Sequence, residues 1–182
     1  GYGITGGEDL EEGGACNSRD FRPGFLAAAA QSRQALDWLA RFDWLDAGHG
    51  VAVGQSYGGA TTLAIAAGDF PGLRAGFNFA GGSGGDPVRT PEQPCSPQRL
   101  QEVYAGFAKT TRVPVSWFYS VNDKYWGPKL PQQWFQAWQE AGGKGEFHVM
   151  PAYRNDGHGI FAGNPDAWKP LLEKPLAALR AH

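Results

Sequence analysis

Long apolar runs, charge of one sign and metal-binding cysteine patterns are all missing from this sequence. Its 182 residues carry 16 Lys and Arg against 18 Asp and Glu, a formal net charge of −2. That balance gives no electrostatic reason to expect nucleic acid or an anionic membrane as a partner. The longest apolar run, around Ala27 to Ala30, gives way at once to polar residues, well short of the roughly 20 residues that cross a bilayer. We therefore expect a soluble globular chain with no membrane partner.

Cysteine and methionine are scarce. The one Met is Met150, and the chain opens at Gly1 with no visible secretory leader. The two cysteines, Cys16 and Cys95, fit neither a zinc-ligand spacing nor a C-x-x-C motif. Both lie in polar stretches containing Gly or Pro, which leaves either two loop thiols or a disulfide. We favour the disulfide, which would stabilise the fold by about 4 kcal/mol in the chain-entropy model. It would indicate a periplasmic or secreted protein, and free thiols a cytoplasmic one.

Cofactor motifs are also missing. The glycine-rich stretch 81–85 lacks the Lys-Ser/Thr pair of a phosphate-binding loop, and no metal-ligand cluster is visible. We expect neither a cofactor nor a metal. Glycine and proline, by contrast, are abundant at 27 and 13 residues, which indicates many tight turns. The length suits one domain, residues 1–182, with a hydrophobic core.

Apolar runs alternate with helical patterns along this domain. We predict strands at 50–54, 75–80, 113–121 and 146–150, and helices at 25–42, 57–67, 97–109, 132–141 and 165–179. Short, nearly continuous apolar strands that alternate with helices are typical of a mainly parallel α/β sheet flanked by helices. Ligands and chemistry gather at the carboxyl ends of the strands in such sheets. Candidate catalytic residues should therefore follow strands directly.

The strongest motif is G-Q-S-Y-G at 54–58, between a predicted buried strand and a predicted helix. G-x-S-x-G in this context places the serine on a sharp, strained turn. We expect that only glycine fits at positions 54 and 58, because the strand and the helix pack together there and leave no room for a side chain on Gly54 or Gly58. The turn would present the Ser56 hydroxyl as a nucleophile and aim the backbone N–H of Tyr57 at a developing oxyanion. The alternative is an ordinary serine at a helix start.

The serine needs a base, and His158 is the best of four histidines. It lies in N-D-G-H-G, a loop after the fourth predicted strand, where flanking glycines let the chain bend the imidazole inward. His148 lies inside that strand, while His49 and His182 should be solvated. An ordinary loop histidine is the alternative for His158.

The base needs a carboxylate to orient it. Asp123 follows the third predicted strand directly and would hold the histidine in the right tautomer. Asp86, after the second strand, is the rival, and Asp156 should instead shape the histidine loop. The order Ser, Asp, His is the one expected of α/β-hydrolases.

Three ordered motifs, G-Q-S-Y-G-G, V-N-D and D-G-H-G, resemble the dienelactone-hydrolase-like branch of the serine α/β-hydrolases. The opening G-Y-G-I-T-G-G is similar to a loop that follows an earlier strand in such enzymes. The resemblance implies hydrolysis through an acyl-enzyme. The family proper is expected to carry Cys where this chain has Ser56, which favours an ordinary carboxylic ester as the small-molecule substrate. A serine peptidase or amidase of the same fold, or a non-catalytic hydrolase-like fragment, remains as an alternative.

The same resemblance implies that the N-terminal strands and the second oxyanion donor lie outside this chain. They would come from a missing N-terminal segment or from a second chain that completes the sheet. For the substrate wall we single out Tyr57, the loop 124–127 with Trp126, and Phe161. For each of these aromatics, packing in the core is the alternative role.

Overall fold

The computed structural model describes residues 16–180. The opening G-Y-G-I-T-G-G motif and His182 lie outside these residues, so the expectations placed on them stay untested.

Four parallel strands form one sheet in the order β1 (Gly50–Gln55), β2 (Leu73–Phe79), β3 (Val115–Ser120) and β4 (Phe147–Met150). All four lie where the sequence predicts strands, and every connection crosses over through a helix or helical segment. Because the strands are parallel and adjacent in chain order, their carboxyl ends meet along one edge of the sheet. Ser56, Asp123 and the glycine-rich loop from Gly81 follow three neighbouring strands at that edge.

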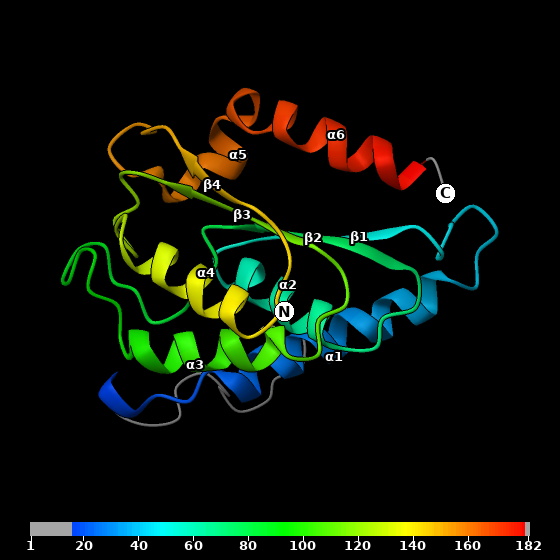
Figure 1. The fold of residues 1–182 in the computed structure, drawn as a ribbon, viewed down its shortest axis with the longest axis horizontal. Coiled ribbons are helices and arrows are strands. Elements are labelled where there is room, and N and C mark those ends of the chain that lie inside the picture. Colours follow the sequence, from blue (N-terminus) through cyan, green and yellow to red (C-terminus); the bar gives the residue numbers. More distant parts are fainter. Residues whose placement is uncertain (1–15, 181–182) are drawn as a thin grey trace.

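Helices cover both faces of the sheet (Figure 1). One face carries α1 (Arg22–Leu39), α2 (Tyr57–Ala67), α3 (Pro97–Ala108) and α4 (Leu130–Glu140), and the other carries α5 (Ile160–Gly163) and α6 (Lys169–Arg180). Short 3₁₀ turns occupy Cys16–Ser18, Gly157–Gly159 and Pro165–Ala167. This is the α/β architecture that the alternating pattern predicts.

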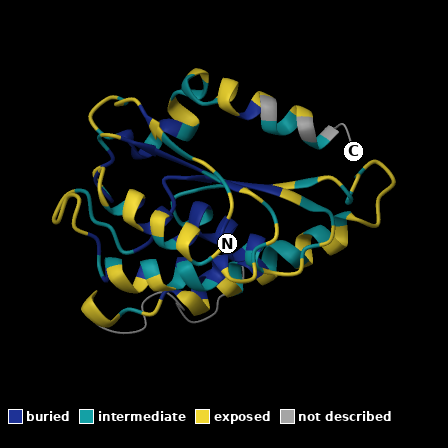
Figure 2. Cartoon of the chain, viewed as in Figure 1, coloured by how far each residue is buried: buried dark blue, intermediate teal, exposed yellow. Residues whose placement is uncertain are grey.

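The sheet separates two hydrophobic cores, one larger than the other. Side chains alternate along each strand, so neighbouring residues of a strand enter different cores. On β3, Trp117 and Tyr119 point into the larger core under α1–α4, and Phe118 points into the smaller one under α5 and α6. On β1 the second face is only thinly covered. Val51 and Val53 are exposed. Figure 2 shows the buried, intermediate and exposed parts of the chain by colour.

The predicted disulfide is present. Cys16 and Cys95 are joined, at a sequence separation of 79. The N–H of Cys95 donates to Gly84 O, and the Ser96 hydroxyl donates to the carbonyl of Cys16. The bridge therefore fastens the start of the described chain to the loop that follows β2.

Candidate active site

The turn at Ser56 has the strained backbone that the motif predicts. Ser56 adopts φ 56° and ψ −123°, between the last residue of β1 and the first of α2. A Cβ on Gly54 would lie 2.0 Å from the carbonyl oxygen of Gly58, so this glycine is required. The expectation for Gly58 is wrong, because a Cβ there would meet nothing within 4 Å. The close approach falls on Gly59 instead, whose Cβ would lie 2.9 Å from the backbone of Phe79.

Backbone hydrogen bonds hold this turn against the next strand. The N–H of Ser56 donates to Phe79 O at 2.9 Å, and the carbonyl of Ser56 accepts from Gly82 N at 3.1 Å. Beneath the turn, the hydroxyls of Tyr104 and Tyr119 both donate to Gly81 O. Burial raises the pKa of both phenols, so each remains a donor. The turn at Ser56 is therefore joined, through residues 81 and 82, to a hydrogen-bond network with two buried tyrosine hydroxyls.

The structure brings Asp123 and His158 together. Nδ1 of His158 lies 3.0 Å from Oδ2 and 3.2 Å from Oδ1 of Asp123, whose side chain is fully buried. The carboxylate also accepts the N–H groups of Tyr125 and Trp126. Because a carboxylate only accepts, Nδ1 carries the imidazole proton in this contact, which leaves Nε2 able to take another. That is the tautomer a general base needs.

Two aromatic rings from the same turn pack against the imidazole. The ring of Tyr125 stacks on His158 with centroids 3.9 Å apart, and Trp126 meets it edge-on at 5.7 Å. Burial, with the nearby Asp156, Asp123 and Asp86 carboxylates, raises the pKa of the Tyr125 phenol. The turn that supplies the acid thus also fixes the plane of the imidazole.

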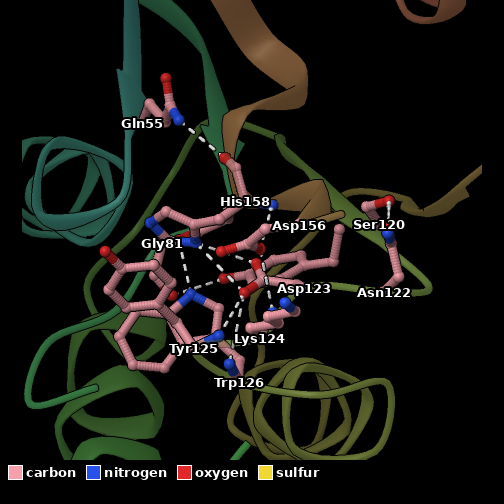
Figure 3. Close-up of polar contacts among 12 residues, drawn as sticks. Gln55, Gly81, Ser120, Asn122, Asp123, Lys124, Tyr125, Trp126, Asp156 and His158 are labelled. Carbon is pink, nitrogen blue, oxygen red and sulfur yellow. Dashed lines mark hydrogen bonds and ion pairs between the residues drawn. The ribbon is translucent and has the colours of Figure 1, made fainter. Parts of the chain in front are cut away.

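Polar side chains tie the three loops of the site together (Figure 3). Oδ1 of Asp156 accepts the N–H groups of both His158 and Lys124, at 3.0 and 3.1 Å. Nε2 of Gln55 donates to the carbonyl of His158 at 2.7 Å. Asn122 binds the start of the histidine loop through Tyr153 N and Arg154 O. Sequence reasoning assigned no role to Gln55 or Asn122, although each stands next to a predicted catalytic residue.

The predicted nucleophile and the predicted base are not hydrogen-bonded to each other in the part of the chain that the structure describes. Among residues 16–180, no hydrogen bond joins the Ser56 hydroxyl to His158. The two residues are linked through Gln55, which directly precedes Ser56 in the chain. Catalytic hydrogen bonds are often long before substrate binds.

The rival residues lie elsewhere. The Asp86 carboxylate accepts the N–H groups of Arg89 and Val88, which lower its pKa, and forms no hydrogen bond with His158. His148 stacks on Phe118, and burial lowers the pKa of its imidazole.

The three predicted substrate-wall aromatics lie in different settings. Tyr57 packs on Phe25, and Phe161 packs on Phe79 in the smaller core. Trp126 is buried, with its indole N–H donating to Ala80 O, and it also borders a pocket of about 470 Å³. The other residues that line this pocket include Pro94, Pro97, Pro128 and Leu130. The substrate-binding roles of Tyr57, Trp126 and Phe161 stay predictions.

Residues 16–180 contain neither a metal-binding cluster nor a membrane-spanning helix. Within residues 16–180, no group of three or more His, Cys, Asp or Glu side chains is placed to hold a metal ion. None of the helices in that span has the length and apolar character needed to cross a bilayer.

Solved structures share this fold. An esterase from Pyrococcus furiosus matches with a TM-score of 0.59 at 11% identity, over 84% of this chain and 61% of its own. A Klebsiella pneumoniae protein, provisionally assigned as a dienelactone hydrolase, matches with a TM-score of 0.58 at 20% identity, over 81% and 60%. An acylaminoacyl peptidase from Pyrococcus horikoshii matches with a TM-score of 0.55 at 12% identity, over 79% and 25%.

All three have the α/β-hydrolase fold, and this chain has part of that fold. It spans about three fifths of the length of the first two and a quarter of the third. No protein-family model matches the sequence, and no curated protein does either.

Proposed function

We propose that this chain carries the catalytic residues of a serine hydrolase that cleaves carboxylic esters. One observation carries the proposal: the buried carboxylate of Asp123 holds Nδ1 of His158, and Gln55 links that histidine to the strained turn of Ser56. A strained serine beside an oriented imidazole is the arrangement that nucleophilic catalysis needs.

The reaction follows from these positions. Ser56 Oγ attacks the ester carbonyl while Nε2 of His158 takes its proton, and Asp123 stabilises the imidazolium. The N–H of Tyr57, the first residue of α2, stabilises the oxyanion. The imidazolium then protonates the departing alcohol and leaves an acyl group on Ser56. Water, deprotonated by His158, attacks the acyl-enzyme, and the imidazolium returns the proton to Ser56 Oγ as the bond from that oxygen to the acyl carbon breaks and the acid leaves.

Peptide or amide hydrolysis by the same residues is the second candidate. It is favoured by the acylaminoacyl peptidase among the structural neighbours. Turnover of a p-nitrophenyl ester together with inertness toward the matching p-nitroanilide would assign the ester.

We also propose that further polypeptide pairs with β1, either from the same protein or from a second chain. Supporting this, β1 has a strand partner on one side only among the described residues, and Val51 and Val53 within this strand are exposed. That polypeptide would supply the second oxyanion donor. The disulfide supports a periplasmic or secreted location.

The decisive experiment is labelling of the intact protein with a fluorophosphonate probe, read by mass spectrometry. We expect one adduct, on Ser56, and loss of both labelling and turnover in Ser56→Ala, with its melting temperature preserved. A protein that takes no adduct and hydrolyses neither substrate would favour the non-catalytic alternative.

A further inference from the structure

Both backbone polar groups of His158 are held by side chains. The N–H donates to Oδ1 of Asp156 at 3.0 Å, and the carbonyl accepts from Nε2 of Gln55 at 2.7 Å. The same oxygen, Oδ1 of Asp156, also accepts a hydrogen bond from the N–H of Lys124 at 3.1 Å. A residue whose backbone N–H and carbonyl are both hydrogen-bonded has little freedom to shift.

These bonds join His158 to the loops of the other two proposed catalytic residues. Lys124 directly follows Asp123, so Asp156 links the base to the acid loop across 32 positions of sequence. Gln55 directly precedes Ser56, so its amide links the base to the nucleophile turn across 103 positions. In Figure 3 the two links reach the backbone of His158 from different elements.

These two links can hold a distance that the proposed catalytic side chains do not fix by themselves, the separation of His158 from Ser56. Asp123 sets the tautomer and plane of the imidazole through Nδ1. The structure records no hydrogen bond that would set the separation of Nε2 from Ser56 Oγ within the described residues. A misplacement of about 1 Å between reacting groups can cost roughly 10²-fold in rate. Some other contact must hold that separation, and the Gln55 amide spans it.

We propose that Gln55 and Asp156 are positioning residues, which hold the backbone of His158 at a fixed place relative to Ser56 and Asp123. The inference rests on the proposed function, because it assigns these residues to the same reaction. Neither side chain touches the reacting atoms. Their removal should therefore lower kcat and leave KM nearly unchanged.

Asp156 is tested with two variants on a p-nitrophenyl ester. Asp156→Ala removes the shared acceptor, and we expect kcat to fall roughly 10- to 100-fold with KM within about threefold. Asp156→Asn keeps an oxygen that can accept the same two N–H groups, so it should recover most of the lost kcat. The matched control is Asp46→Ala, which removes a carboxylate that accepts a backbone N–H two residues ahead, from Gly48, at the opposite edge of the sheet. It should retain the kcat of the unmodified protein.

Gln55 is tested with Gln55→Leu, which keeps a similar volume and removes the donor. We expect a comparable fall in kcat and slower fluorophosphonate labelling of Ser56. Gln132→Leu is the control, because Gln132 also donates from Nε2 to a backbone carbonyl, that of Pro128, but on the exposed face of α4. All rates are measured well below the melting temperature of each variant.

The outcomes separate the inference from the function. An unmodified protein that neither labels nor turns over ester overturns the proposed function, and this inference with it. An active protein whose Gln55→Leu and Asp156→Ala variants keep more than half of its kcat overturns the inference alone. Equal losses in Asp156→Ala and Asp156→Asn would also overturn it, since the acceptor oxygen would then not be the cause.

Discussion

Two Asp–His pairs lie at opposite edges of the sheet, and the closer pair is the less consequential. Asp46 and His49, before β1, are 2.7 Å apart, with side chains 70% and 40% exposed. Asp123 and His158, after β3 and β4, are 3.0 Å apart, with side chains fully buried and 11% exposed. Water competes for the first pair, which lowers its worth. The second lies behind two aromatic rings, where a charge contact is less screened. Distance alone therefore does not identify a site.

The largest difference between the pairs should appear on removing a charge. Asp123→Asn keeps the shape but allows the wrong imidazole tautomer, so we expect ester turnover to fall by roughly 10⁴-fold. Asp46→Asn should leave turnover within about twofold, as surface changes usually do. Steady-state rates of the two variants decide the matter. Similar losses in both would break the comparison.

The loop that carries His158 should be far less tolerant of added bulk at one glycine than at the other. A Cβ on Gly157 would lie 2.2 Å from Ser120 Oγ and 2.4 Å from Asn122 Oδ1, whereas one on Gly159 would meet nothing. Gly157→Ala should cost about 1–3 kcal/mol of unfolding free energy. Gly159→Ala should stay within about 0.5 kcal/mol. Urea denaturation measures both, and equal values would show that the loop relaxes freely.

The buried pair differs from the exposed pair in having the Tyr125 ring stacked on its imidazole. Tyr125→Leu removes the ring that lies 3.9 Å from the imidazole, and Tyr125→Phe keeps it. An aromatic contact of about 0.5–1.5 kcal/mol corresponds to a fall of roughly 2- to 12-fold in kcat for the leucine variant. The phenylalanine variant should retain the rate. If both variants lost it equally, the hydroxyl rather than the ring would be responsible.

The smallest effect is expected at the exposed pair, and only in acid. The N–H of Gly48, followed by the side chain of His49, lowers the pKa of Asp46 from 3.8. A carboxyl whose folded pKa is depressed stabilises the fold above its unfolded pKa and loses that contribution as pH falls through the folded value. The small melting-temperature difference between the unmodified protein and Asp46→Asn should therefore shrink as the pH falls below 3.8, and it should vanish once the pH lies below the lowered pKa of Asp46 in the folded protein. A difference that persisted there would point to shape instead of charge.

The sequence predicted the sheet and the positions of Asp123 and His158 after its strands because both follow local rules. Apolar runs bounded by glycine mark the strands, and chemistry collects after parallel strands. It did not predict which glycine is crowded, since the contact at Gly59 depends on Phe79 of the neighbouring strand. It also missed the Gln55 link, because a hydrogen bond across 103 positions depends on how two loops meet in space. Helix bounds shifted by a few residues: α1 begins at Arg22, where Phe21 and Phe25 are buried.

The disulfide places the three proposed catalytic residues in two parts of the chain that would respond differently to a pulling force. It closes a loop that contains β1, α2, β2 and the Ser56 turn, while Asp123 and His158 lie outside it. A force pulling on the two ends of the chain would pass from Cys16 to Cys95 through the sulfurs. Roughly 260–280 Å of contour length would be shielded from extension, from a separation of 79 residues at about 3.3–3.6 Å each. Stretching would thus draw the acid and base away while the nucleophile's strand stayed unextended, and reduction would remove that protection.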